Sequence, residues 1–102
     1  MRELLTREPG LDGVFAANDL MALGAIGVLE DAGRRVPQDV SVVGFDDSAL
    51  APLARPPLTS VRQPIEEMTA EMVALLHARL EEPARAVPPV VFEATLQVRA
   101  SS

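Results

Sequence analysis

The sequence predicts an α/β fold with a parallel β-sheet. Two short apolar runs, residues 13–17 and 40–45, flank a segment in which apolar residues recur at helical spacing. A strand–helix–strand unit of this length joins its strands by a right-handed crossover, which makes the strands parallel. The chain has 102 residues, of which 48% are hydrophobic, so it has the size and composition of one small folded domain.

The N-terminal part is expected to form a helix, a strand and a second helix. Residues 1–8 are charged and helical in character, and Pro9 ends that segment. Residues 13–17 lie between turn signals, which is typical of a short buried strand. Asp19 is expected to cap the next helix, which runs from residue 20 to about residue 32.

The middle of the chain adds a second buried strand. Gly33 stands where a glycine commonly ends a helix, and the apolar run 40–45 follows after a short turn. The stretch 48–57 contains three prolines and is therefore expected to be largely irregular. Residues 59–62 are expected to form a short extended segment.

A long helix and a final strand complete the prediction. Pro64 opens the helix, which runs to about residue 82 and ends before Pro83. Its apolar stripe, at spacings of three and four residues, consists of Ile65, Met68, Met72, Leu75, Leu76 and Leu80. Residues 90–99 alternate with period 2, which predicts a strand buried on one face.

The helix predicted over residues 20–32 is apolar on two sides. A wide arc that should lie on the sheet contains Met21, Ala22, Ala25, Ile26, Val28, Leu29 and Ala32. The opposite side carries Leu20, Leu23, Gly24 and Gly27 where solvent is expected. Such a side indicates either a helix buried within a larger domain or a contact between subunits, since exposed apolar patches mark contact sites.

Charge and composition exclude several functions. All nine basic residues are scattered arginines and the formal net charge is −6, so direct binding of duplex DNA by this chain is not expected. The absence of cysteine excludes disulfides and thiol catalysis. No apolar run is long enough to span a membrane. The single histidine, His77, lies on the acidic face of its predicted helix and is expected to be exposed to solvent, away from the strand ends. We expect no catalytic residue, metal site or cofactor.

Polar residues follow both predicted parallel strands. Asn18 comes after the first strand, and Asp46 and Asp47 come after the second. Ligands of open parallel sheets bind beyond the carboxyl ends of the strands. Amide and carboxylate groups side by side suit the vicinal hydroxyls of a sugar or nucleoside. These residues and Asp19 also fit a role as helix caps and turn formers, and spacing alone leaves both interpretations open.

Four motifs resemble those of lactose-repressor-type (LacI/GalR) transcriptional regulators. In the family's order, they are VFAANDLMALGA (14–25), VPQDVSVVGFDD (36–47), PPLTSVRQP (56–64) and LQVRASS (96–102). The resemblance covers nearly the whole chain. It implies the C-terminal part of a periplasmic-binding-protein-like (type I) effector domain, with an incomplete parallel-sheet α/β fold.

The resemblance also implies a function and its residues. Asn18 and Asp46 match positions that hydrogen-bond the ligand, often a sugar, and Gln63 lies at a crossover near the cleft. The homodimer interface of the intact regulator would include Leu20, Leu23, Gly24, Gly27, Leu50 and Leu53. Such a protein is a cytoplasmic repressor rather than an enzyme.

The resemblance places the chain in only part of a regulator. Residues 1–58 and 88–102 match the C-terminal subdomain of the effector domain, and residues 59–87 match the crossover and a helix that packs on the N-terminal subdomain. DNA would be bound only through a helix-turn-helix that these residues do not include, so the chain is expected to be a fragment. The alternative is part of a sugar-binding transport protein of the same fold.

Overall fold

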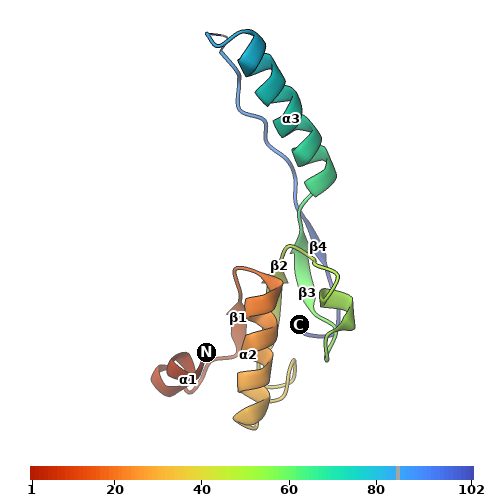
Figure 1. The fold of residues 1–102 in the computed structure, drawn as a ribbon. Helices are drawn as coiled ribbons and strands as arrows, with labels where there is room; N and C mark the ends of the chain where they lie inside the picture. Colours follow the sequence, from red (N-terminus) through yellow and green to blue (C-terminus); the bar gives the residue numbers. More distant parts are fainter. Residues whose placement is uncertain (85) are drawn as a thin grey trace. The chain divides into compact units, whose positions relative to one another are not determined.

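The computed structural model describes residues 1–84 and 86–102. The chain divides into two compact units. The first unit contains Met1–Arg62 and Thr95–Ser102, and the second contains Gln63–Ala94. The sheet belongs to the first unit, together with the first two helices (Figure 1).

Four strands form the sheet in the order β1-β2-β3-β4. The first three, β1 (Gly13–Phe15), β2 (Ser41–Phe45) and β3 (Thr59–Arg62), are parallel. The last, β4 (Thr95–Gln97), is antiparallel to β3. The predicted α/β fold with a parallel sheet is confirmed, and the antiparallel edge strand is a feature that the sequence did not predict.

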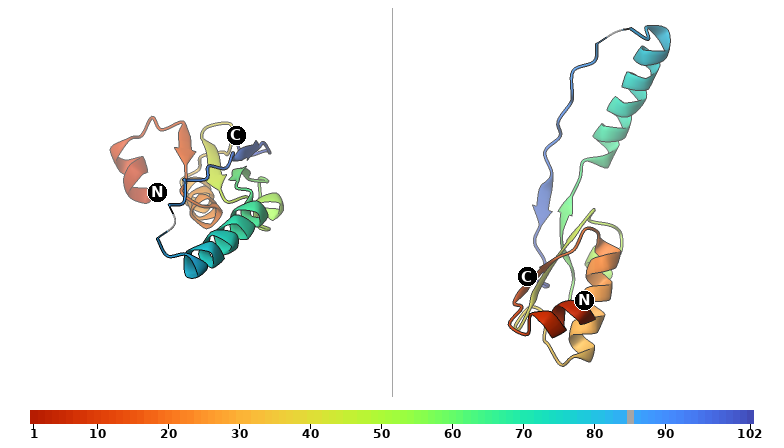
Figure 2. Two further views of the ribbon diagram at one scale, coloured as in Figure 1. Left: turned by 90° about the horizontal axis from the view of Figure 1, so that it is seen from above. Right: turned by 90° about the vertical axis from the view of Figure 1, so that its left-hand side faces the viewer.

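Helix α2 (Asp19–Asp31) packs on one face of the sheet and supplies three of the eight residues of the core cluster (Figures 1 and 2). Its residues at spacings of three and four turn inward against strand residues of β2 and the segment before β3. The buried core consists of Ala16, Ala22, Ile26, Leu29, Val40, Val42, Ala51 and Leu58. Gly33 has a φ of 74° just after the helix, which is the left-handed conformation expected of a glycine there.

Two predictions about α2 are wrong. The N-cap is Asn18, whose side chain accepts a hydrogen bond from the Met21 amide, and Asp19 is buried in the first turn. Met21 is 57% exposed and Ala32 is also exposed, so the buried arc is narrower than predicted. A helix that packs on one face of a sheet buries one stripe of its surface, and residues at the edge of a wide apolar arc stay outside that stripe.

The predicted strand over residues 90–99 is also wrong in length, because only Thr95–Gln97 form a strand. Strict alternation makes a strand only where a neighbour offers backbone partners. Here β3 pairs with three residues of β4, and the residues up to Ala94 belong to the second unit.

The C-terminus joins β2 to β3 through one buried serine. The Ser101 hydroxyl donates to the Val42 carbonyl at 2.6 Å and accepts from the Thr59 amide at 2.8 Å. The Ser101 carbonyl in turn accepts from the Val42 amide at 2.7 Å. β3 begins opposite Val43, so Val42 has no partner residue within β3. Ser101, in the last motif of the chain, hydrogen-bonds the backbone of Val42 in its place.

The second unit contains α3 (Ile65–Glu81), which confirms the helix predicted after Pro64. All α3 residues are exposed or half-buried. The most exposed members of the apolar stripe are Ile65, Met72, Leu76 and Leu80. Leu75 contacts a cavity of about 180 Å³ that is also lined by Val87 and Val90. Among the described residues of the second unit, the apolar stripe of α3 is thus largely uncovered.

Candidate functional site

Asn18 and Asp46 lie at the same edge of the sheet, beyond the carboxyl ends of β1 and β2. The two strands pair in parallel with Phe15 opposite Val43, so the residues that follow them emerge on one side. Asn18 uses its side-chain oxygen to cap α2, at 2.8 Å from the Met21 amide. The cap does not need the amide nitrogen of Asn18, which can donate to a ligand. Capping and ligand binding are therefore compatible at this residue.

Asp46 and Asp47 diverge, as expected of neighbouring residues. Asp46 is exposed, whereas the Asp47 side chain is only 1% exposed. Both residues have a positive φ, of 99° and 49°. Residues other than glycine rarely adopt this conformation, and where they do the position is often functional.

Asn18 and Asp46 are each followed by an aspartate, Asp19 and Asp47. Both aspartates form a hydrogen bond with the hydroxyl group of Ser60. The Ser60 hydroxyl donates to Oδ1 of Asp19 at 2.6 Å and accepts from the Asp47 amide at 3.0 Å. Oδ2 of Asp19 accepts from the Ser48 amide at 2.6 Å. Each predicted ligand residue is thus followed by an acidic residue that fixes it to the same point on β3.

The Asp47 carboxylate lies between two arginines. Oδ2 accepts from Nε of Arg62 at 2.6 Å. Nη1 of Arg99 forms an ion pair with Oδ1 at 2.7 Å and also donates a hydrogen bond to the Leu58 carbonyl. Burial acts to raise the pKa of Asp47, but the guanidiniums of Arg99 and Arg62 outweigh it and hold the pKa below its usual range. The side chain therefore stays ionised at neutral pH.

Gln63 is half-buried and is the first residue of the second unit. The first unit brings Asn18 and Asp46 to one edge without it. A ligand contact from Gln63 stays a prediction.

The residues predicted for a subunit interface lie on an open surface of the first unit. Leu20 is 68% exposed and Leu53, in the 3₁₀ helix η1 (Ala51–Leu53), is 75% exposed. Leu50 is exposed and Leu23 is half-buried. A Cβ atom added at Gly24 or Gly27 would meet nothing within 4 Å. This side of α2 therefore has room for a close neighbour.

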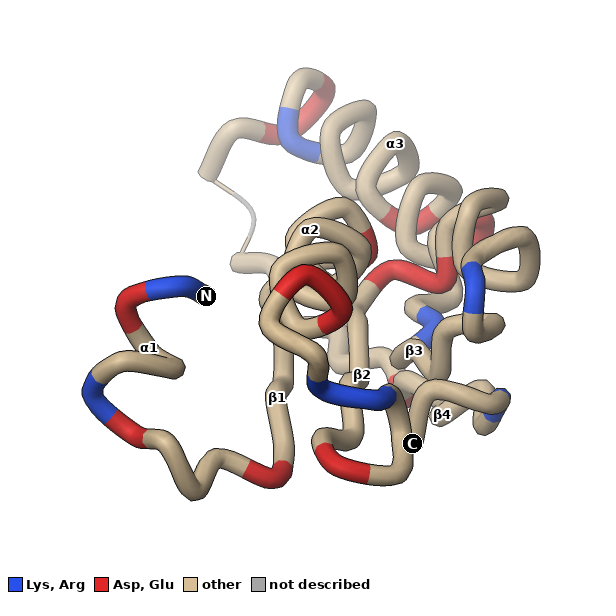
Figure 3. The backbone as a smooth tube through the Cα atoms, turned by 90° about the horizontal axis from the view of Figure 1, so that it is seen from below, with Lys and Arg blue, Asp and Glu red and all other residues tan. Residues whose placement is uncertain are grey.

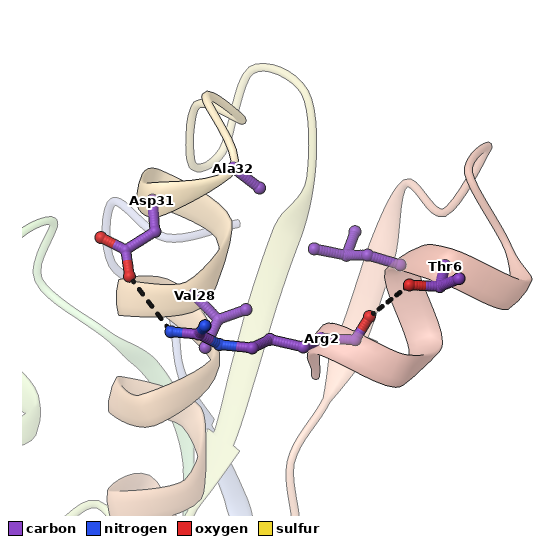
Figure 4. Close-up of a pocket in the computed structure, with 6 residues that line it drawn as sticks. Arg2, Thr6, Val28, Asp31 and Ala32 are labelled. Atoms are coloured by element: carbon purple, nitrogen blue, oxygen red, sulfur yellow. Dashed lines mark hydrogen bonds and ion pairs between the residues drawn. The ribbon is translucent and has the colours of Figure 1, made fainter.

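A cavity of about 300 Å³ lies between α1 (Arg2–Arg7) and α2, away from this edge (Figure 4). The Arg2 side chain crosses it to Asp31 at 3.6 Å, and both side chains are mostly exposed. The cavity is at the C-terminal end of α2, whereas Asn18 caps the N-terminal end, about 20 Å away along a helix of 13 residues. The cavity is therefore separate from the candidate site.

Charged residues of both signs alternate at the N-terminus. In α1 the basic positions stand beside acidic ones (Figure 3). Within residues 1–84 and 86–102, no cluster of three His, Asp or Glu side chains is placed to bind a metal. No helix in the same described part is long and apolar enough to cross a membrane.

The sequence did not indicate the residues that hold the site in place. Ser60, Arg62 and Arg99 contact Asp19 or Asp47 from positions 13 to 52 residues away in the chain. The local signals were a serine within the segment predicted to be extended and an arginine at each end of the β3–β4 pair. Neither signal identifies its partner.

One protein-family model matches the whole chain. Residues 1–102 match the family described as periplasmic binding protein-like domain. The chain therefore belongs to the periplasmic binding protein-like domain family.

Individual relatives are regulators of the LacI/GalR type, which confirms the resemblance inferred from the motifs. The HTH-type transcriptional regulator CelR of Thermobifida fusca is 54% identical over 101 residues, which cover 99% of this chain and 30% of CelR. The chain thus spans less than a third of that relative.

Two solved structures agree with this assignment. A CelR–cellobiose complex superposes with a TM-score of 0.93 at 52% identity, over 99% of this chain and 31% of the other. The lac repressor dimer bound to operator and the anti-inducer ONPF has a TM-score of 0.86 at 29% identity, over 98% of this chain and 35% of the other.

Proposed function

We propose that this chain is the effector-sensing and dimer-forming part of a LacI-type transcriptional repressor. The observation that carries this proposal is the pair Asn18 and Asp46 at one edge of the sheet, in a chain that matches a CelR–cellobiose complex along 99% of its length. The relatives are named as transcriptional regulators, which favours this role over transport and over catalysis.

The effector is a small polyhydroxylated molecule, and cellobiose is the first candidate. Asp46 accepts hydrogen bonds from ligand hydroxyls and the Asn18 amide nitrogen donates one, which together suit a neutral sugar. Gln63 adds a third polar contact. Binding shifts the balance between two conformations of the regulator and so alters operator affinity. DNA is bound by a separate N-terminal helix-turn-helix domain, and the protein works in the cytoplasm.

Two subdomains share the chain in this proposal. Residues 1–58 and 88–102 belong to the C-terminal subdomain of the effector domain. Residues 59–87 provide the crossover and a helix whose apolar stripe packs on the N-terminal subdomain; Arg85 lies outside the described residues. The exposed stripe of α3 supports this, since an apolar face of that size requires a partner.

Replacing Asp46 by alanine should weaken cellobiose binding about a hundredfold, because a site built for hydroxyls loses its acceptors. Alanine is strained at the φ of 99°, so Asp46→Gly is the second variant, since glycine accepts that conformation. Titration calorimetry on the full-length protein measures the affinity, and gel shifts should show unchanged operator binding.

Asp12→Ala is the matched control for this experiment. Asp12 is an exposed acidic residue before β1, so the variant loses one carboxylate elsewhere in the same unit and should bind cellobiose normally. Unchanged affinity in both Asp46 variants would make Asp46 a turn residue only, and the site assignment would be wrong.

Replacing Gly27 by arginine should weaken dimerisation about a hundredfold or more. An arginine on a self-complementary interface meets its own copy or an apolar surface, and both arrangements are costly. The monomer has open space at Gly27, and arginine favours helix over glycine by about 1 kcal/mol. Sedimentation velocity over a concentration series measures the dimer constant.

Gln38→Arg adds the same charge at an exposed turn outside the proposed interface. It should leave the dimer constant unchanged. A Gly27→Arg protein that dimerises as tightly as the Gln38→Arg protein would remove α2 from the interface.

A further inference from the structure

The turn after β2 has an unusual backbone for its residues. Asp46 and Asp47 are two consecutive non-glycine residues with positive φ angles, of 99° and 49°. A conformation of this kind persists only where surrounding contacts hold it. Two hydrogen bonds tie the backbone here, from the Asp46 amide to the Val61 carbonyl at 2.9 Å and from the Asp47 amide to the Ser60 hydroxyl at 3.0 Å.

Side-chain contacts at Asp47 fix the turn from the inside. The Asp47 cluster consists of the Asp47 carboxylate with Arg62 and Arg99. Nε and Nη2 of Arg62 both lie 2.6 Å from Oδ2, and Nη1 of Arg99 lies 2.7 Å from Oδ1. With the Asp47 side chain 1% exposed and each oxygen facing a different guanidinium, the carboxylate has one position available.

We propose that Asp47 is a positioning residue, whose buried carboxylate holds the turn in the conformation that presents Asp46 to the ligand. The inference rests on the proposed function for Asp46 as the ligand contact. Asp47 itself faces inward and does not touch the ligand. The two arginines flank the β3–β4 pair, because Arg62 ends β3 and Arg99 follows β4, so both ends of that pair determine where Asp46 lies.

The variant Asp47→Asn removes the negative charge of residue 47 and keeps its preference for the observed backbone conformation. Asparagine has nearly the same size and adopts a positive φ as readily as aspartate, so a residue needed only for the turn would be replaced without loss. Removing the charge abolishes both ion pairs. If the turn conformation that presents Asp46 to the ligand is then populated only a few per cent of the time, the affinity for cellobiose falls about tenfold to a hundredfold.

Two further variants extend the test. Asp47→Gly accepts the backbone conformation without strain but removes the carboxylate, and should lose affinity to a similar extent. Arg62→Gln removes one partner whose side chain is 56% exposed, so the fold tolerates it, and the affinity should fall about threefold to tenfold. Asp12→Asn, at an exposed acidic position, is the control.

Amide hydrogen exchange measured by NMR on the full-length protein gives a readout without ligand. In Asp47→Asn the amides of residues 46 and 47 should lose protection, while the amides of Val42 and Leu29 in the core keep it. Loss of protection throughout the first unit would instead mean that Asp47 only stabilises the fold, and would overturn the inference.

The two proposals fail separately. Native cellobiose affinity and native exchange in Asp47→Asn overturn the positioning role, even if Asp46→Gly loses binding. Native affinity in Asp46→Gly overturns the ligand role of Asp46, and the exchange of residues 46 and 47 then still decides whether Asp47 holds the turn.

Discussion

Replacing Asp19 by alanine is expected to lower the free energy of unfolding by about 3–5 kcal/mol. The Asp19 side chain is buried and accepts hydrogen bonds of 2.6 Å from the Ser48 amide and the Ser60 hydroxyl. Alanine leaves both donors without their acceptor and leaves a small cavity beneath the loop that follows β2. Urea unfolding followed by circular dichroism measures the loss.

Asp31→Ala is the matched control on the same helix. Asp31 is exposed and its ion pair with Arg2 is 3.6 Å long, so its removal should change the free energy of unfolding by less than about 1 kcal/mol. An Asp19→Ala protein as stable as the Asp31→Ala protein would show that the buried network at the candidate site contributes nothing to the fold.

Replacing Gly44 by alanine should cost about 2–4 kcal/mol by the same measurement. A Cβ atom at this position would overlap Oδ1 of Asp19 and lie 3.0 Å from Cδ2 of Leu58. Asp19 cannot move aside, because two hydrogen bonds hold its carboxyl group. Gly44 is therefore required by close approach between β2 and α2.

Gly13→Ala on β1 is the control for Gly44→Ala, since a Cβ atom at Gly13 meets nothing within 4 Å. It should alter stability by no more than about 0.5 kcal/mol. The double variant Asp19→Ala with Gly44→Ala should lose less than the sum of the single variants, by about 1 kcal/mol or more, because removing the carboxyl group makes room for the methyl group. Strict additivity would contradict the contact.

The sequence by itself determined the α/β architecture and indicated candidate site residues whose ligand role stays a prediction. Apolar runs between turn signals and the helical spacing of apolar residues are local patterns, and they located the first two parallel strands and both long helices of the chain. The rule that ligands bind beyond the carboxyl ends of parallel strands indicated Asn18, Asp46 and Asp47. The resemblance to LacI/GalR regulators then selected Asn18 and Asp46.

Only the tertiary structure decided what the neighbouring acidic residues do. Asp19 was predicted to be a helix cap, and Asp47 fitted a turn role, because local spacing allows both. Their partners Ser60 and Arg99 lie 41 and 52 residues further along the chain, and no local pattern indicates such a contact.

The same limit explains the final strand. Alternation over residues 90–99 predicted a long strand, but a strand exists only where another one pairs with it, and β3 is four residues long. Periodicity reports which side of a segment is apolar. Which segment covers that side, and over what length, depends on the distant residues that the fold brings against it.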